Sequence, residues 1–222
     1  MIYVISDIHG EYEKFMNILM QIMFSDKDKM YILGDVIDRG KDSIKCLQYI
    51  MKQPNMEMIW GNHEDMLWKS IIDKNQNYYY CWMNNGGYST LTQFNTLSDN
   101  EQLDLLNYLQ ECEPFIILDK YILVHAGIDV SKFNFDLSIK ENLMNQDTQY
   151  LLWERDDFIY DRNKFLKDYT IIFGHTPTEF MQYDDPMKIW HSRNRIGIDC
   201  GACFTGGRLA CLRLDDMKEF YS

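Results

Sequence analysis

Residues 29–40 have the sequence KMYILGDVIDRG, in which an apolar run leads into a turn that carries two carboxylates and a guanidinium. An apolar run of this length, bounded by a glycine, is typical of a buried strand. The start of the chain has the same arrangement, since the apolar run at residues 2–6 leads directly into DIHG at residues 7–10. Each of these units therefore delivers polar side chains to the point where a strand ends.

Apolar residues at helical spacing separate these strands, in residues 12–24 and 43–51, and a third strand pattern follows at residues 56–60. Strands that alternate with helices pair in parallel through helical crossovers. In such sheets, ligands gather beyond the carboxyl ends of the strands. The sequence therefore predicts that the turns after these strands share one edge of a sheet.

Four of the five histidines lie in turns that directly follow strand patterns. These turns are DIHG at residues 7–10, GNHE at 61–64, HAG at 125–127 and GHTP at 174–177. Imidazole and carboxylate are ligands that borderline divalent metals prefer. One histidine after a strand is more often structural, but several at one sheet edge predict a two-metal site with Asp35 between the ions. The candidate ligands are Asp7, His9, Asp35, Asn62, His125 and His175.

The remaining histidine, His191, has no companion ligand nearby in the sequence, and we interpret it as structural or peripheral. The six cysteines are irregularly spaced, which favours reduced thiols over a disulfide framework. The CGAC segment at residues 200–203 is a single CxxC, and we interpret it as core packing.

The composition bounds the class of protein. The chain has 222 residues, of which 46% are hydrophobic and 25% charged, which predicts one soluble domain over residues 1–222. Its formal net charge of −12 disfavours long nucleic acid as a partner. No apolar run approaches the ~18–20 residues of a membrane span, and the N-terminal run turns polar at once, unlike a signal peptide. We therefore expect a cytoplasmic protein without a membrane partner.

Residues 64–114 have mainly helical patterns, including a capping box, SDNE, at residues 98–101. The aromatic cluster YYYCW at residues 78–82 has two interpretations, core or lid packing and substrate stacking, and packing is favoured. The second half has strand patterns in six runs. These are residues 115–118, 121–124, 170–173, 188–190, 195–199 and 208–214. An α/β domain with one mixed sheet or two facing sheets accounts for them.

The order and spacing of the polar turns at residues 7–10, 34–40, 61–64, 125–127 and 174–177 resemble the metallophosphoesterase superfamily, as does IDCGA at residues 198–202. Within it they resemble the phosphoprotein phosphatase branch, which includes bacterial and phage Ser/Thr phosphatases. The resemblance implies a four-layer α-β-β-α sandwich of the calcineurin-like type, with mixed sheets. It implies a two-metal site in which Asp7, His9 and Asp35 hold one ion, and the other is held by Asp35, Asn62, His125 and His175.

The same resemblance implies catalytic roles for four further residues. His63 would be the general acid, oriented by Asp38, and Arg39 would hold phosphate oxygens. Arg155, in LWER at residues 152–155, would be the second phosphate arginine, although a salt bridge to a neighbouring acidic residue is the alternative.

The expected activity is hydrolysis of phosphoserine or phosphothreonine in proteins, by direct attack of a metal-activated water on phosphorus. Two divalent ions are expected, most simply Mn²⁺, although Fe, Zn, Co or Ni suit the same ligands. The alternative is a dinucleoside polyphosphate hydrolase of the same superfamily; Asp38 and Glu64 favour the protein phosphatases. Cyclic nucleotides, RNA-end phosphates and a catalytically dead scaffold are further alternatives. The partner is a phosphoprotein or a small phosphoester, and the sequence leaves the oligomeric state open.

Overall fold

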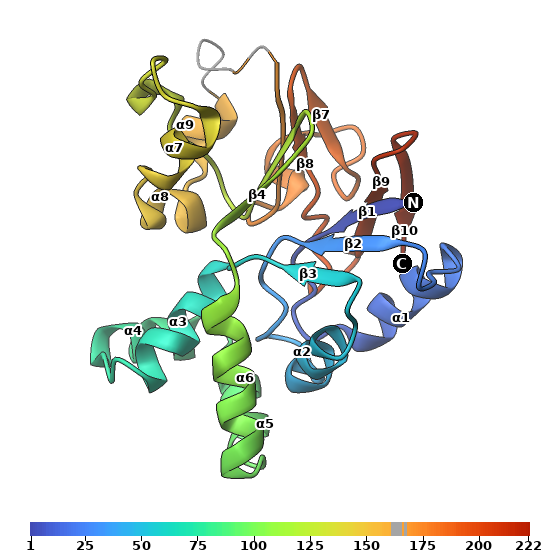
Figure 1. Cartoon of the computed structure of the whole chain (residues 1–222). Coiled ribbons are helices and arrows are strands. Elements are labelled where there is room, and N and C mark those ends of the chain that lie inside the picture. The colour runs from blue at the N-terminus through green and yellow to red at the C-terminus, as the bar shows by residue number, and fades with distance from the viewer. Residues whose placement is uncertain (161–165, 167) are drawn as a thin grey trace.

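The computed structural model describes residues 1–160, 166 and 168–222. Its strands form two five-stranded sheets (Figure 1). The first sheet has the order β10-β9-β1-β2-β3. In it β1, β2 and β3 pair in parallel, β9 pairs antiparallel with β1, and β10 pairs antiparallel with β9. Its strands are β1 (Ile2–Ile5), β2 (Lys29–Ile32), β3 (Met56–Met58), β9 (Ala210–Arg213) and β10 (Lys218–Tyr221).

The second sheet has the order β4-β5-β6-β8-β7. Strands β5, β6 and β8 are parallel, while β4 and β7 are antiparallel edges. Its strands are β4 (Phe115–Leu118), β5 (Tyr121–Val124), β6 (Thr170–Phe173), β7 (Trp190–Ser192) and β8 (Arg195–Gly197). Both sheets are therefore mixed, as the sequence predicts.

The helices fall into two groups along the chain. The first group is α1 (Tyr12–Gln21), α2 (Ser43–Met51), α3 (Asn62–Ile71), α4 (Gln76–Asn84), α5 (Tyr88–Phe94) and α6 (Asp99–Glu111). The second group, with the short 3₁₀ turns, is η1 (Val130–Lys132), α7 (Ile139–Met144), α8 (Thr148–Trp153), α9 (Asp156–Tyr160) and η2 (Thr178–Phe180). The segment that the sequence presents as mainly helical, residues 64–114, contains α4, α5, α6 and most of α3.

Alternation along β1 and β2 creates two different apolar layers. Ile5 and Ile32 pack with Phe15 of α1 and Leu47 of α2 on the outer face of the first sheet. Val4, the intervening residue of β1, points the other way, toward the second sheet. Successive side chains of a strand face opposite sides of its sheet. Because both faces of this sheet are covered by other layers, its strands are apolar on both faces.

The second sheet repeats this arrangement. Leu123 and Ile172 contribute to the layer between the sheets, where Val4 also lies. Ile122 and Ile171 face outward and pack with residues of α7, α8 and α9. The molecule is thus a helix–sheet–sheet–helix sandwich, and the four-layer prediction is confirmed (Figure 1).

Element boundaries differ modestly from the sequence predictions. The strand β7 covers Trp190–Ser192, so it begins and ends two residues later than the run predicted at residues 188–190. The edge strand β10 at Lys218–Tyr221 was not predicted. Edge strands are short and half exposed, so their hydrophobic pattern is weak. In the described part of the chain, no helix has both the length and the apolar character that a membrane crossing requires.

Candidate functional site

The candidate residues lie where parallel strands end. Asp7 and Asp35 follow β1 and β2, Asn62 begins α3 just after β3, and His125 and His175 follow β5 and β6. The backbone bends sharply at these turns, and several of the residues have positive φ angles, which non-glycine residues adopt at a cost of about 1–3 kcal/mol each. They are Asp7 (50°), His9 (46°), Asp35 (51°), Asp38 (72°), Arg39 (65°) and His175 (63°).

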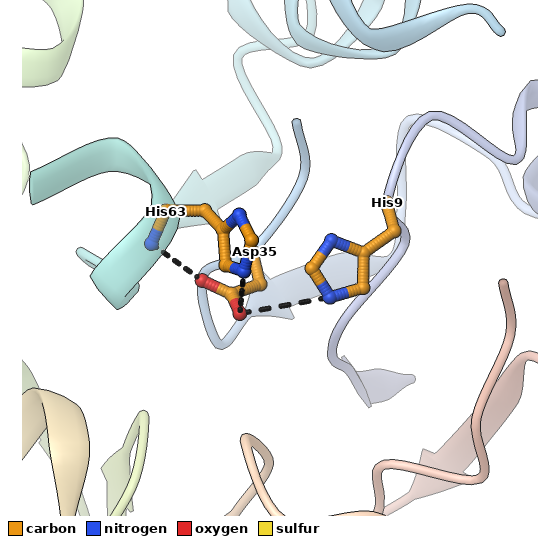
Figure 2. Close-up of side chains that lie close together, drawn as sticks. All are labelled: His9, Asp35 and His63. Atoms are coloured by element: carbon orange, nitrogen blue, oxygen red, sulfur yellow. Dashed lines mark hydrogen bonds and ion pairs between the residues drawn. The ribbon is translucent and has the colours of Figure 1, made fainter. Parts of the chain in front are cut away.

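Asp35 is the centre of the site. Its Oδ2 lies 3.7 Å from Nε2 of His9 and 3.8 Å from Nε2 of His63, while its Oδ1 lies 3.5 Å from Nε2 of His125. Figure 2 shows dashed lines from the Asp35 carboxylate to the His9 and His63 rings. The two oxygens of one carboxylate thus face two different groups of imidazoles, the arrangement that the sequence analysis expects of a bridging ligand.

Two clusters result, and Asp35 belongs to both. In the first, ligand atoms of His9, Asp35 and His63 lie within 4.8 Å of one another, and in the second those of Asp35, His125 and His175 do. All of these side chains are buried. Asn62 adds an oxygen to the second cluster, because its Oδ1 lies 2.9 Å from Nε2 of His125.

Hydrogen bonds to backbone carbonyls orient two of the rings. Nδ1 of His9 lies 2.9 Å from the Ile37 carbonyl, and Nδ1 of His125 lies 2.6 Å from the Leu33 carbonyl. A carbonyl only accepts, so each Nδ1 carries a proton, and in the neutral ring the lone pair lies on Nε2, which faces the site. In most proteins a metal-binding imidazole is oriented by a hydrogen bond that its other ring nitrogen donates to a carbonyl, a carboxylate or water.

Asp7 joins the two sheets. Its Oδ2 accepts from the Ser6 hydroxyl and from the backbone N–H of His175, the latter at 3.0 Å. Its Oδ1 lies 4.0 Å from Nε2 of His9, so the carboxylate borders the first cluster. The approach requires glycine at position 174, where a Cβ would lie 2.2 Å from Oδ2 of Asp7.

Glu64 holds two of the turns in place without facing the cavity. Its Oε2 accepts from the backbone N–H groups of Asp35 (2.9 Å) and Gly61 (3.1 Å), and its Oε1 accepts from that of Val36 (2.9 Å). Burial and the nearby Asp35 charge raise the pKa of Glu64, while the backbone N–H groups of Asp35 and Val36 act to lower it. The sequence singled out Glu64 only as a mark of one enzyme branch, and its structural role was missed.

His63, Asp38 and Trp82 form a buried chain of hydrogen bonds. Nδ1 of His63 lies 2.6 Å from Oδ2 of Asp38. The indole N–H of Trp82 donates to the same Oδ2 at 2.8 Å. Trp82 belongs to the aromatic cluster that the sequence analysis assigned to packing, and it is indeed fully buried. Its hydrogen bond to Asp38 was not predicted, because no local pattern links residues so far apart in the chain.

Two arginines line a cavity of about 520 Å³ beside the clusters. Nη1 of Arg39 donates to Nε2 of His9 at 2.8 Å, and Nη2 of Arg39 lies 3.1 Å from Nε2 of His63. Arg155 donates from Nη1 to the His175 carbonyl (2.9 Å) and lies 3.2 Å from the Thr176 hydroxyl. Both guanidiniums therefore reach the same cavity.

Part of that cavity wall is aromatic, and it comes from Tyr160, Phe180 and Phe204. The remaining lining residues are Asp156, His175, Thr176 and Pro177. The guanidinium of Arg39 lies 5.9 Å from the ring centroid of Phe204 and its Nη1 lies 3.7 Å from Sγ of Cys203. The CGAC segment is therefore not purely core: Cys200 is buried, but Cys203 is only partly buried and lies beside Arg39.

The pKa of His63 is shifted in the opposite direction to those of His9 and His175. Burial, with the charges of His63 and Arg39, holds the pKa of His9 well below its ordinary value. Burial, with His125 and Arg155, does the same for the pKa of His175. Burial acts to lower the pKa of His63 as well, but Asp35 and Asp38 outweigh it and hold that pKa above its ordinary value.

These shifts suit different tasks. A neutral imidazole is a metal ligand, whereas an imidazolium can give up a proton. Burial acts to raise the pKa of Asp35, but His125 and His63 outweigh it and keep the pKa low, so this carboxylate stays ionised. The donor set of imidazoles, carboxylates and one amide oxygen therefore fits borderline divalent cations.

A cation on Nε2 of His9 would displace Arg39 from that nitrogen, because the two would use the same lone pair. His191, by contrast, lies away from the clusters on β7, where its Nε2 is 2.7 Å from a carboxylate oxygen of Glu219. The peripheral role predicted for it is consistent with that position.

Paired clusters that can hold cations, at one edge of a two-sheet sandwich, characterise the metal-dependent phosphoesterases. The chain belongs to this class, and specifically to the Calcineurin-like phosphoesterase family, whose sequence model matches residues 1–205. The resemblance noted in the turns is thereby confirmed, and so is the expectation of a hydrolase. The catalytically dead scaffold gains no support from the site, because every turn keeps its polar residues.

Two kinds of curated relatives match. The chain is 32% identical over 226 residues to serine/threonine-protein phosphatase 2 of Escherichia coli (strain K12), a match that covers 96% of this chain and 92% of the relative. It is 36% identical over 135 residues to the symmetrical bis(5'-nucleosyl)-tetraphosphatase of Buchnera aphidicola subsp. Acyrthosiphon pisum (strain 5A), which covers 57% of this chain and 44% of that relative.

Solved structures share the fold. One, described as a candidate diadenosine tetraphosphatase, superposes with a TM-score of 0.69 at 18% identity, covering 100% of this chain and 92% of the other. A metallophosphoesterase from Sphaerobacter thermophilus gives a TM-score of 0.59 at 16% identity, with 99% of this chain and 86% of the other covered. At these identities the likeness concerns the architecture alone.

Proposed function

We propose that the protein is a phosphomonoesterase that removes phosphate from phosphoserine or phosphothreonine in proteins. The observation that carries the proposal is the position of His63. Its Nδ1 is held by Asp38 at 2.6 Å, and its Nε2 faces Arg39, which lines the cavity with Arg155. His63, a proton donor, is thus fixed beside the two guanidinium groups that can bind a phosphate.

Each of these side chains has a distinct task in the proposed reaction. Arg39 and Arg155 bind the phosphoryl oxygens, since a guanidinium matches the spacing of those oxygens. The proton on Nε2 of His63 passes to the departing alkoxide oxygen, which makes it a better leaving group. Asp38 keeps the ring in the correct tautomer and stabilises its charged form.

Two divalent cations complete the site in this proposal. The residues that would hold them are Asp7, His9, Asp35, Asn62, His125 and His175, with Asp35 serving both. When bound, they would supply an activated water and positive charge that offsets that of the phosphate. We favour Mn²⁺, because this mixture of oxygen and nitrogen donors suits it, and Fe, Zn, Co and Ni fit the same donors.

Two observations favour a protein substrate. Serine/threonine-protein phosphatase 2 of Escherichia coli is 32% identical over 96% of this chain, whereas a Buchnera tetraphosphatase that aligns with 98% of the chain is 24% identical to it. Asp38 and Glu64 are also the residues expected of the protein phosphatases. A phosphorylated protein met in the cytoplasm is therefore the proposed substrate.

A second candidate function is hydrolysis of a dinucleoside polyphosphate. The observation in its favour is the aromatic wall of the cavity, where Phe180 and Phe204 lie beside the arginines. Aromatic rings of this kind can stack on a nucleobase while the arginines hold the phosphate chain. The same wall can also accommodate the apolar side chains of a peptide.

The deciding experiment compares phosphoserine and phosphothreonine peptides with diadenosine tetraphosphate. The protein is stripped of metal with a chelator and reloaded with Mn²⁺, and released phosphate or nucleotide is quantified. We expect turnover of the peptides and little of the nucleotide. Turnover of the nucleotide alone would reject the proposed substrate in favour of the second candidate.

A further inference from the structure

We propose that Trp82 is a positioning residue of this reaction, acting on His63 through the carboxylate of Asp38. The inference rests on the acid role proposed for His63. One oxygen, Oδ2 of Asp38, accepts both the indole N–H of Trp82 (2.8 Å) and the ring N–H of His63 (2.6 Å). Two donors from different helices, α4 and α3, thus meet on one atom.

The other carboxylate oxygen does not help to orient Asp38. Among the residues that the structure describes, Oδ1 of Asp38 is a buried atom without a hydrogen-bond partner. Rotation of a terminal carboxylate is a soft motion with broad energy wells. The direction in which Asp38 presents Oδ2 to His63 is therefore set by His63 itself and by Trp82.

The segment around Trp82 also fixes the backbone of the turn. The backbone N–H of Asp38 donates to the Thr90 hydroxyl at 2.9 Å, and that of Arg39 donates to the Gly86 carbonyl at 3.2 Å. Both donors belong to residues with positive φ, which need surrounding contacts to stay in place. Residues 82–90 thus hold Asp38 by its side chain and by its backbone.

A purely structural role is the competing explanation. Trp82 is fully buried in the same apolar cluster as Met66 and Leu67, and a buried indole N–H needs some acceptor. The two explanations differ in what the loss of the N–H should do. If Trp82 only stabilises the fold, every substrate should be affected alike, whereas loss of ring orientation should harm only reactions that need the acid.

The experiment replaces Trp82 by phenylalanine, which keeps an aromatic ring and removes the donor. Hydrolysis of phenyl phosphate is compared with that of p-nitrophenyl phosphate in the Mn²⁺-loaded enzyme. Both are small aryl esters, so the comparison does not depend on the protein substrate, and only the more basic phenolate requires a proton. We expect Trp82→Phe to lower kcat on phenyl phosphate about tenfold or more, and on p-nitrophenyl phosphate about threefold or less, because general acids contribute ~10²–10⁴-fold.

Two further variants make the result specific. Trp68→Phe is the matched control, since Trp68 lies on α3 and packs edge-on against Trp60 at 5.9 Å between ring centroids. It should leave the ratio of the two rates unchanged. In a His63→Asn background, Trp82→Phe should cause no further selective loss, because the residue through which it acts is already absent.

The outcomes separate the two proposals. If Trp82→Phe lowers both rates equally, or neither, the positioning role is rejected. The same holds if the selective loss persists in the His63→Asn background. If His63→Asn alone shows no selectivity between the two esters, the acid assignment fails first, and the present inference fails with it. If the wild-type enzyme hydrolyses both aryl esters but no phosphopeptide, the proposed protein substrate is rejected. The role of Trp82 is then still decided by the rates on the two aryl esters.

Discussion

The carboxylate of Glu64 accepts the backbone N–H of Asp35 at 2.9 Å, so a buried side chain at the start of α3 holds the turn that follows β2. Through Gly61 and Val36, the same carboxylate also ties the turns after two neighbouring strands to each other. The spacing between Asp35 and the imidazoles of the site is therefore set in part by a residue that faces none of them.

Glu64→Gln should destabilise the protein strongly. The amide nitrogen would point its hydrogens at backbone N–H groups, leaving buried donors unpaired at a cost of about 3 kcal/mol. We expect the melting temperature to fall by roughly 6–12 °C, measured by calorimetry. Glu57→Gln is the control, because Glu57 is exposed and pairs with Lys29 at the surface, where an ion pair contributes about 0–1 kcal/mol. Equal melting temperatures for both variants would contradict the anchoring role.

Asp35→Asn should abolish cation binding and activity together. The amide offers one neutral oxygen where the carboxylate offers two charged ones to the two clusters. The measurements are metal content after dialysis and hydrolysis of p-nitrophenyl phosphate, for which we expect a loss of about 10³-fold or more. The exposed Asp26→Asn should match the wild type in both. A variant of Asp35 that keeps two cations and full activity would refute the bridging role.

His63→Asn should slow esters with basic leaving groups far more than p-nitrophenyl phosphate. The departing nitrophenolate hardly needs a proton, whereas the alkoxide of a phosphoserine peptide does, so about 10²-fold or more separates the two losses. Rates on both substrates with Mn²⁺ provide the test. His191→Asn, on the exposed strand β7, is the matched control. Equal losses on both esters would argue against an acid at this position.

Arg155→Lys should weaken transition-state binding while leaving the cations in place. A lysine has one ammonium in place of the planar fork that bonds the His175 carbonyl and the Thr176 hydroxyl. We expect kcat/KM to fall about 10–100-fold, which corresponds to one or two charge-assisted hydrogen bonds. Metal content should not change. Arg213→Lys, which breaks an exposed pair with Asp216, should have little effect on either quantity.

We expect Asp129 to make the free energy of unfolding depend on pH. Burial acts to raise the pKa of Asp129, but hydrogen bonds from Ser131 and the charge of Lys132 outweigh it and hold that pKa below its ordinary value. The folded chain thus binds the proton less readily than the unfolded chain. The stabilisation is complete above the unfolded-state pKa and is lost as the pH falls through the lower, folded-state pKa.

Asp129→Asn keeps the acceptor oxygen and removes the charge. We expect its melting temperature at pH 7 to be lower than that of the wild type by about 1–4 °C. The difference should vanish in acid, where the wild-type carboxylate is itself protonated. Thermal unfolding followed by circular dichroism from neutral pH downward provides the measurement. A difference that stays constant over the whole range would contradict the assignment.

The turns that carry the candidate ligands could be predicted because each is a local pattern. An apolar run followed at once by a short polar turn identifies both the strand and the residue at its end, and parallel pairing then brings Asp7 and Asp35 to one edge. The layered fold followed from the same runs, since residues such as Val4 and Ile5 must be covered on opposite faces of the sheet.

The supporting contacts could not be predicted in this way. Trp82 and Asp38 are 44 residues apart in the chain, and only tertiary packing brings the indole to the carboxylate. The role of Glu64 likewise depends on how α3 meets the turn after β2. Between residues 128 and 169, Arg155 and Tyr160 border the cavity, and residues 161–165 and 167 lie outside the described residues.

The hydrogen bond from the backbone N–H of His175 to Asp7 spans the seam between the two sheets. Any motion that slides one sheet past the other has to break this bond and carry His125 and His175 away from Asp35. Sliding along this seam would therefore separate the candidate ligands that the two sheets contribute. Deuterium exchange at the His175 amide should accordingly be among the slowest in the chain, and it should quicken only under conditions that also abolish turnover.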